Sequence, residues 1–282
     1  MKEKQGVILV ALAMVLFSTG GFFIKLIDTS ATTITFIRAI TAAMMFMPFM
    51  EWKKLKLSRN AIILALAYSY LSIIFVLTTK MTTAANAIIF QCTAPLWLYA
   101  YYVLRGKKIE LRELFPRILI LIGIVTIFSD SSGGNLIGDL LSLSNGIAYA
   151  FVQCYMDKEY PYSDVTVTGF NNLLLAILTL VIFHRQFAFS SINPAGWMSL
   201  VYLGIFQIGT AYLVFMKGVK RVSALKSSMI ALLEPILNPI FVMIFVGEVP
   251  SVIAFLGFGM ILAGILWSVI PVRTRTVVPQ KK

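Results

Sequence analysis

The 282-residue chain is 59% apolar, has a mean hydropathy of +0.88 and carries only 24 basic and 12 acidic residues. A water-soluble domain is about half apolar and about a quarter charged, so this composition excludes a soluble globular protein and predicts an integral membrane protein. The formal charge of +12 does not indicate nucleic-acid binding, because no segment outside the apolar runs is long enough to form a basic, solvated domain. We expect the lipid bilayer as a partner and no nucleic acid.

In chain order, polar residues divide the sequence into apolar runs of roughly the 20 residues that a helix needs to cross about 30 Å of hydrocarbon. Ten runs result: 6–27, 31–50, 60–79, 84–104, 115–129, 136–156, 165–184, 195–216, 223–246 and 251–270. They lack the strict alternation of apolar and polar residues that is typical of strands in a membrane barrel. The sequence therefore predicts an all-α integral membrane protein with ten transmembrane helices.

Basic residues fall mainly on alternate connections between these runs. With the N-terminus in the cytoplasm, 20 of the 24 lie on the inner side, Lys25, Lys80 and Arg185 lie on the outer side, and Arg38 lies within a span. Because positively charged loops stay in the cytoplasm, we expect a multi-pass protein of the plasma (inner) membrane with both termini cytoplasmic. We expect Lys25 and Lys80 to extend from their span ends toward the outer interface.

The two halves of the chain resemble each other at an offset near 140 residues. TTAANAIIFQCTAPLW (82–97) aligns with VSALKSSMIALLEPIL (222–237), so that Pro95 falls on Pro235. Each half holds five spans, an odd number, so the second half enters the membrane in the opposite direction, and we expect two inverted five-helix repeats. The predicted units are a first repeat, a second repeat and a basic cytoplasmic tail: 1–130, 136–270 and 271–282.

Prolines lie inside the fourth and ninth predicted spans. Pro95, Pro235 and Pro239 each remove one helical hydrogen bond and free the carbonyl four residues earlier. Such a carbonyl is tolerated in a membrane where protein or a water-lined cavity satisfies it. We expect both spans to face a central cavity; a kink that serves packing alone is the alternative.

The stretch SSMIALLEPILNPIFVMIFVGEVPSVIAFLGFGMILAGILW (227–267), with its EP and GE pairs and its glycine-rich last span, resembles EamA-type members of the drug/metabolite transporter superfamily. FIR in the second span, Lys25 at the end of the first and CTAPLW in the fourth extend the resemblance over essentially the whole chain. The resemblance implies a ten-helix exporter of small metabolites, built from two inverted five-helix repeats around a central cavity.

Glu234 is the one acidic residue near the middle of a predicted span, about eleven residues or roughly 16 Å deep. A carboxylate there costs on the order of 3 kcal/mol, so it is a candidate site for a proton or a polar substrate. The alternative is a structural carboxyl, protonated or paired with an arginine. Arg38 has three candidate roles: counter-ion to Glu234, anchor for a substrate carboxylate, or a side chain that snorkels to the outer interface.

Other polar and aromatic residues lie on spans that should face inward. The further candidates for the binding site are Gln91, Trp97, Asn145, Tyr149, Gln153, Asn172 and Asn238. Hydrogen bonds between helices explain such residues equally well. Cys92 and Cys154 lie within spans, at no spacing typical of a metal site, and we expect neither a metal nor another cofactor.

These features favour a secondary transporter that exports small organic metabolites, such as amino acids, amines or drug-like solutes, with or without proton coupling. No nucleotide-binding loop of the GxxxxGKT type is present, and the clustered His, Asp or Cys residues of a membrane enzyme are missing. The alternatives are an uptake permease of the same fold and, in another class, a membrane scaffold or lipid enzyme. Gly259 and Ala263 form a small-xxx-small pair that favours a close helix contact, for example in a homodimer.

Overall fold

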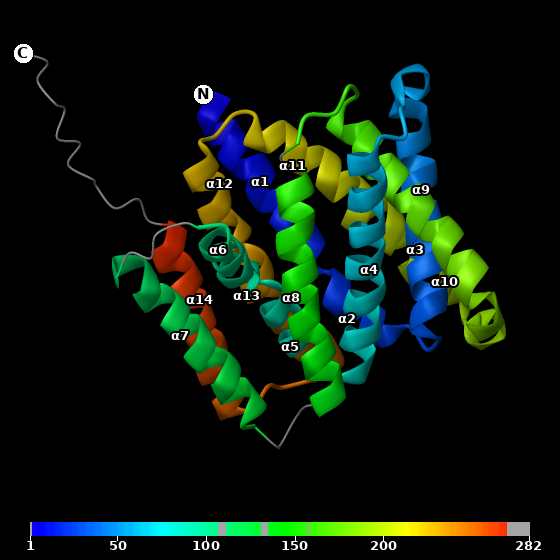
Figure 1. Cartoon of the computed structure of the whole chain (residues 1–282). Coiled ribbons are helices and arrows are strands. Elements are labelled where there is room, and N and C mark those ends of the chain that lie inside the picture. The colour runs from blue at the N-terminus through cyan, green and yellow to red at the C-terminus, as the bar shows by residue number, and fades with distance from the viewer. Residues whose placement is uncertain (1, 107–110, 131–134, 157, 270–282) are drawn as a thin grey trace, which may run out of the picture.

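The computed structural model describes residues 2–106, 111–130, 135–156 and 158–269, and within these ranges the chain is helical without a strand (Figure 1). The all-α prediction is confirmed. The predicted tail, 271–282, lies outside the described residues.

Helices follow one another with short connections. The first half contains α1 (Lys2–Ser18), α2 (Gly20–Leu26), α3 (Ala31–Phe46), α4 (Arg59–Met81), α5 (Ala84–Gln91), α6 (Ala94–Leu104) and α7 (Leu111–Phe128). The second half contains α8 (Leu136–Met156), α9 (Asp164–Phe183), α10 (Pro194–Tyr202), α11 (Ala211–Val219), α12 (Ala224–Ala231), α13 (Leu233–Val246) and α14 (Val252–Val269). A π-helical segment, η5 (Leu203–Thr210), joins α10 to α11, and short 3-10 turns occupy the connections after α3 and α9.

Seven helical stretches of the described chain are long and apolar enough to cross a membrane. They are Glu3–Leu26, Ala31–Phe49, Arg59–Met81, Ala84–Leu104, Asp164–Gln186, Pro194–Val219 and Lys226–Val246. The apolar helix Val252–Ser268 is shorter, and α7 and α8 do not belong to this set. A multi-pass helical protein is therefore shown, whereas the count of ten spans stays a prediction.

Polar residues that divide the sequence also start the helices. Eight side chains of the described chain accept a hydrogen bond from the backbone N–H three residues later: Ser30, Ser58, Thr83, Asn135, Ser163, Asn193, Ser223 and Ser251. Such caps satisfy an N–H group that has no partner within its helix. This is why the starts of several predicted spans agree closely with the observed helices.

Two of the predicted spans are broken near their middle. The helix stops at Gln91 and resumes at Ala94, and it stops at Ala231 and resumes at Leu233. Pro95 and Pro235 therefore lie in the first turn of a new helix, where the missing N–H has no intrahelical partner to lose. The helical hydrogen-bond pattern is interrupted at these two prolines, although the linking residues Cys92, Thr93 and Leu232 keep right-handed backbone angles. Pro239 lies inside a helix.

The two broken helices run in opposite directions. Lys226 at the start of α12 forms an ion pair with Glu3 (Nζ–Oε1 2.5 Å), whereas the N–H of Ala84 at the start of α5 donates to Glu248 beyond the end of α13 (2.7 Å). We call the end of the bundle that holds Glu3 the near end, and the end that holds Glu248 the far end. The N-terminus lies at the near end, at the top of Figure 1, and the connection from α13 to α14 lies at the far end.

Helices α7 and α14 pack against each other through glycines at the edge of the bundle (Figure 1). A Cβ built on Gly123 would lie 2.7 Å from the carbonyl oxygen of Gly257, and one on Gly264 would lie 2.6 Å from that of Pro116. Only glycine permits so close an approach of two backbones. Gly259, the predicted contact residue, is not part of this seam, since nothing lies within 4 Å of its Cβ position.

Candidate functional site

A cavity of about 510 Å³, here called the wide chamber, lies among α4, α6, α8, α9, α11 and α12. Its polar and aromatic wall consists of Tyr68, Tyr102, Tyr149, Gln153, Thr168, Asn171, Tyr212, Phe215 and Ser228. Tyr102 lies in the last turn of α6, and Met156, which also lines the chamber, is the last residue of α8. The wide chamber therefore begins at the near end, and its volume is that of a typical small-molecule site.

A second cavity of about 280 Å³, the deep chamber, shares Tyr149, Gln153 and Ser228 with the wide chamber, so the two are continuous. Its remaining wall comes mainly from the two helix breaks: Gln91, Cys92, Ala94, Pro95, Ala231, Leu232, Glu234 and Pro235. The expectation that both proline-containing spans face a cavity is therefore confirmed.

Glu234 lies in the first turn of α13, with its side chain half-buried on the wall of the deep chamber. Among the described residues that line the two chambers, it is the only charged one. No hydrogen bond or ion pair holds its carboxyl group within the described chain, although its backbone carbonyl accepts from the Ser18 hydroxyl at 3.4 Å. A negative charge in the first turn of a helix is favoured by the helix dipole, which helps to keep this carboxyl in place.

Gln91 reaches the deep chamber from the end of α5. Asn145, fully buried on α8, donates its amide Nδ2 to Gln91 Oε1 at 3.0 Å. Gly146 beside it lets α8 approach the break between α5 and α6, because a Cβ there would lie 2.5 Å from the carbonyl oxygen of Phe90. Asn145 therefore positions a chamber residue and does not itself line either chamber.

Asn172 has a similar position relative to the wide chamber. Its Oδ1 accepts from the Tyr68 hydroxyl at 3.3 Å, and its Nδ2 donates to the carbonyl oxygen of Thr168 at 2.9 Å. Both partners line the chamber, whereas Asn172 is fully buried behind them. We conclude that Asn172 orients the Tyr68 ring.

Arg38 is buried on α3, with 7% of its surface exposed and its guanidinium 6.0 Å from the centre of the Phe75 ring. It lines neither chamber, and no ion pair between Arg38 and Glu234 exists among the described residues. The structure thus does not bring these two candidates together. Its burial also disagrees with the snorkelling alternative.

Trp97 and Asn238 lie outside the chambers. Trp97 donates its indole N–H to the Thr93 hydroxyl at 3.0 Å and lines a groove between α6 and α8 that borders the wide chamber. Asn238 is buried on α13 against Gly21, at the start of α2. Of the nine candidates, four line the chambers directly: Gln91, Tyr149, Gln153 and Glu234.

Sequence reasoning missed several residues in the wall of the wide chamber: Tyr68 of α4, Tyr102 of α6, Thr168 of α9 and Ser228 of α12. Tyr68 belongs to the motif AYSYLS, and its spacing alone does not distinguish a chamber residue from an interfacial aromatic.

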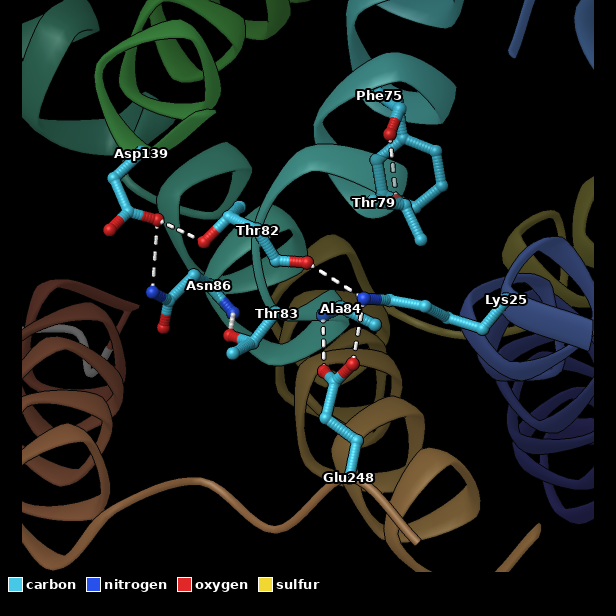
Figure 2. A network of polar contacts seen from close by, with 9 residues as sticks. All are labelled: Lys25, Phe75, Thr79, Thr82, Thr83, Ala84, Asn86, Asp139 and Glu248. Carbon is cyan, nitrogen blue, oxygen red and sulfur yellow. Dashed lines mark hydrogen bonds and ion pairs between the residues drawn. The ribbon is translucent and has the colours of Figure 1, made fainter. Parts of the chain in front are cut away.

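A polar network closes the packing at the far end, as Figure 2 shows. Lys25 Nζ forms an ion pair with Glu248 Oε2 at 2.7 Å and donates to the carbonyl oxygen of Thr82 at 2.8 Å. The other carboxylate oxygen of Glu248 accepts from the N–H of Ala84 at 2.7 Å. The network thereby joins α2, the start of α5 and the end of α13.

Asp139 extends this network to α8 (Figure 2). Its Oδ1 accepts from the Thr82 hydroxyl at 2.6 Å and from Asn86 Nδ2 at 2.9 Å, and only 5% of the residue is exposed. Lys80 donates to the carbonyl oxygen of Ile27 at 2.5 Å. Lys25 and Lys80 therefore both bond to partners at the far end of the bundle that no local pattern reveals, and their extension to the interface stays a prediction.

Comparison with known proteins agrees with this architecture. A crystal structure with 15% sequence identity matches 94% of this chain and 97% of its own with a TM-score of 0.63, which shows a shared fold. Among named relatives, an uncharacterized transporter of Archaeoglobus fulgidus is 24% identical over 93% of this chain and 96% of its own length. An uncharacterized transporter of Clostridium kluyveri is 27% identical over 93% of this chain and 92% of its own length. The uncharacterized transporter YxxF of Bacillus subtilis is 23% identical over 93% of this chain and 89% of its own length.

The model of the EamA-like transporter family matches the chain twice, at residues 4–129 and 136–270. Together these matches cover nearly all of the described helices, including both helix breaks and both chambers. The chain therefore belongs to the EamA-like transporter family.

Proposed function

We propose that the protein is a secondary transporter that exports small organic solutes across the plasma membrane by alternating access. The observation that carries this proposal is the pair of connected chambers, which reach from the near end to the mid-bundle carboxyl of Glu234. At the far end, the ion pair of Lys25 with Glu248 holds the helices together. A site that is reached from one end while the other end is closed is what alternating access requires.

For the architecture, we propose ten spans in two inverted five-helix repeats, residues 1–130 and 136–270. The double family match and the opposite directions of α5 and α12 support this proposal. The helix starts also support it, because Ala84 and Ala224, which begin α5 and α12, are paired by the alignment of the two halves.

For the direction, we propose that the near end and both termini are cytoplasmic. This orientation places 20 of the 24 basic residues on the inner side. The chambers then face the cytoplasm, where an exporter takes up its solute. Uptake by the same fold is the alternative, and transport assays with a defined protein orientation distinguish the two.

For the site, we propose that Glu234 binds the solute or a proton beside Gln91, Tyr149 and Gln153. In this proposal Asn145 and Asn172 act as positioning residues through their hydrogen bonds to chamber side chains. Binding roles for Arg38, Trp97 and Asn238 stay predictions that the geometry does not favour.

The test is transport in proteoliposomes across a panel of amines, amino acids and carboxylates, with and without a proton gradient. We expect wild-type protein to move at least one class. If Glu234 carries the proton, Glu234→Gln abolishes gradient-driven movement while counterflow exchange survives; loss of both assigns Glu234 to solute binding. The control Glu51→Gln, in the exposed connection after α3, keeps both activities. Absence of transport by the wild type, with unchanged cellular export by Glu234→Gln, would contradict the proposal.

A further inference from the structure

The described residues that line the two chambers include one acidic side chain and no basic one. Among the described lining residues the only ionisable acid or base of the Asp, Glu, Lys, Arg and His types is Glu234. The Glu234 carboxyl has no hydrogen-bonding or ion-pairing partner within the described chain. A carboxylate that is removed from bulk water needs a positive partner, and the chamber wall supplies none.

Aromatic rings surround the approach to this carboxyl. Four tyrosines from four different helices line the wide chamber: Tyr68 of α4, Tyr102 of α6, Tyr149 of α8 and Tyr212 of α11. Tyr149 also lines the deep chamber beside Glu234. The face of a tyrosine ring attracts a cation, and an ammonium group without hydrogen-bond donors is held particularly well by several such rings.

Tyrosines elsewhere in this protein already hold cations. Lys158 Nζ lies 3.8 Å from the centre of the Tyr155 ring, and Arg105 Cζ lies 5.5 Å from that of Tyr101. Both basic residues line the groove between α6 and α8, which shares Leu98, Tyr102 and Cys154 with the wide chamber. Neither of them lines the deep chamber, which holds Glu234.

We propose that the transported solute is a small organic cation, a primary to quaternary amine without a carboxylate, held by Glu234 and the chamber tyrosines. The inference rests on the proposed transport function and narrows its substrate class. An amino acid would pair its ammonium group with Glu234, but its carboxylate would then meet no basic side chain among the described lining residues and would lie near a like charge. The site should therefore reject amino acids relative to the corresponding amines.

The test uses three molecules of one shape: choline, its uncharged isostere 3,3-dimethylbutan-1-ol, and betaine, which keeps the quaternary ammonium and adds a carboxylate. Binding to the purified full-length protein is measured by calorimetry, and transport is measured by counterflow in proteoliposomes. We expect choline to bind at least about tenfold more tightly than either analogue, because only choline gains both the charge pair and the cation–π contacts without a carboxylate penalty.

Two variants separate the contributions of charge and ring. Glu234→Gln should weaken choline binding by at least about thirtyfold and leave the weak binding of the uncharged isostere unchanged. Tyr149→Phe keeps the ring and should bind choline within about threefold of wild type, whereas Tyr149→Leu should lose roughly fivefold. Glu51→Gln, which removes a partly exposed acid that lines neither chamber, is the control with unchanged binding.

The outcomes distinguish this inference from the proposed function. Equal or tighter binding of betaine or of the uncharged isostere, or choline binding that Glu234→Gln leaves unchanged, overturns the cation assignment even when transport of another solute proceeds. If choline binds tightly but no solute in the panel is moved, the proposed transport function is contradicted, whereas the proposed cation-binding site is supported.

Discussion

Acidic residues at the far end and in the middle of the helix bundle have opposite surroundings. At the far end, Asp139 and Glu248 are each held by two donors, and their bonds tie α2, α5, α8 and α13 together. In the middle of the bundle, Glu234 faces a chamber with no donor to its carboxyl among the described residues. A fully partnered acid stabilises one packing of the helices, whereas an unpartnered one is available to a solute or a proton. The difference separates the residues that close the bundle from those that we propose to act in transport.

The largest expected effect on stability is at Asp139. Asp139→Ala should lower the free energy of unfolding by about 2–4 kcal/mol, because the Thr82 hydroxyl and the Asn86 amide lose a charged acceptor in a buried place. Denaturation of the purified variants in detergent micelles measures this change in the free energy of unfolding. Glu234→Gln is the matched control, since it removes a carboxyl without such donors and should cost less than about 1 kcal/mol. Equal losses in the two variants would remove the distinction between the far-end network and the chamber carboxyl.

A second effect concerns the packing beside the deep chamber. Gly146→Ala should cost about 1–3 kcal/mol, because its Cβ would lie 2.5 Å from the backbone carbonyl oxygen of Phe90 and α8 would have to move away. The same substitution at Gly259, which has open space around its Cβ position, should be neutral or slightly stabilising. Thermal unfolding of the two variants side by side checks this, and a neutral Gly146→Ala would show that α8 is not tightly fixed there.

Breaking the ion pair between Lys25 and Glu248 should have a smaller effect on stability, and it should make the far end of the bundle more accessible to a labelling reagent. Lys25 and Glu248 are 16% and 21% exposed, so we expect Lys25→Met to cost about 1–2 kcal/mol. Glu248→Gln should cost a similar amount, and the double variant should cost less than the sum of both. Labelling of a cysteine placed at Thr83 should become faster in Lys25→Met. Strict additivity of the two substitutions would show that the pair carries no coupling.

The smallest expected effect is the pH response of Glu51, an exposed acid at the near end. Its pKa is lowered from 4.5 by the hydrogen bond and charge of Lys54 and by the N–H of Ser163. Because the folded-state pKa lies below the unfolded one, the contribution of Glu51 is complete above the unfolded value and is lost as the pH falls through the folded value. Unfolding midpoints of wild type and Glu51→Gln should therefore converge in acid, and a constant difference down to the lowest pH would contradict this assignment.

Helix existence and several helix starts could be predicted from the sequence, because capping residues such as Ser58 and Thr83 act within one turn. Glu234, Gln91, Tyr149 and Gln153 could also be predicted, since polar groups deep in apolar spans turn toward the protein interior. These inferences use only local chemistry and the properties of the bilayer.

Other parts depend on contacts between distant segments or on helix geometry. The partnership of Lys25 with Glu248 joins residues in different halves, so no spacing rule reveals it. The sequence pattern predicts Trp97 beside the cavity, but its indole bonds to Thr93, at the interruption between Gln91 and Ala94, and lines the groove between α6 and α8. Asn238 meets Gly21 because α2 approaches α13 there, which depends on tertiary packing.

The carboxylate of Glu248 has a consequence for the way in which the far end opens. One of its oxygens binds Lys25 of α2 and the other binds the first N–H of α5. A shift of this carboxylate that is large enough to release α2 also removes the cap from α5, so both bonds break in the same event. Such shared bonding favours an all-or-none switch between two discrete arrangements over gradual widening.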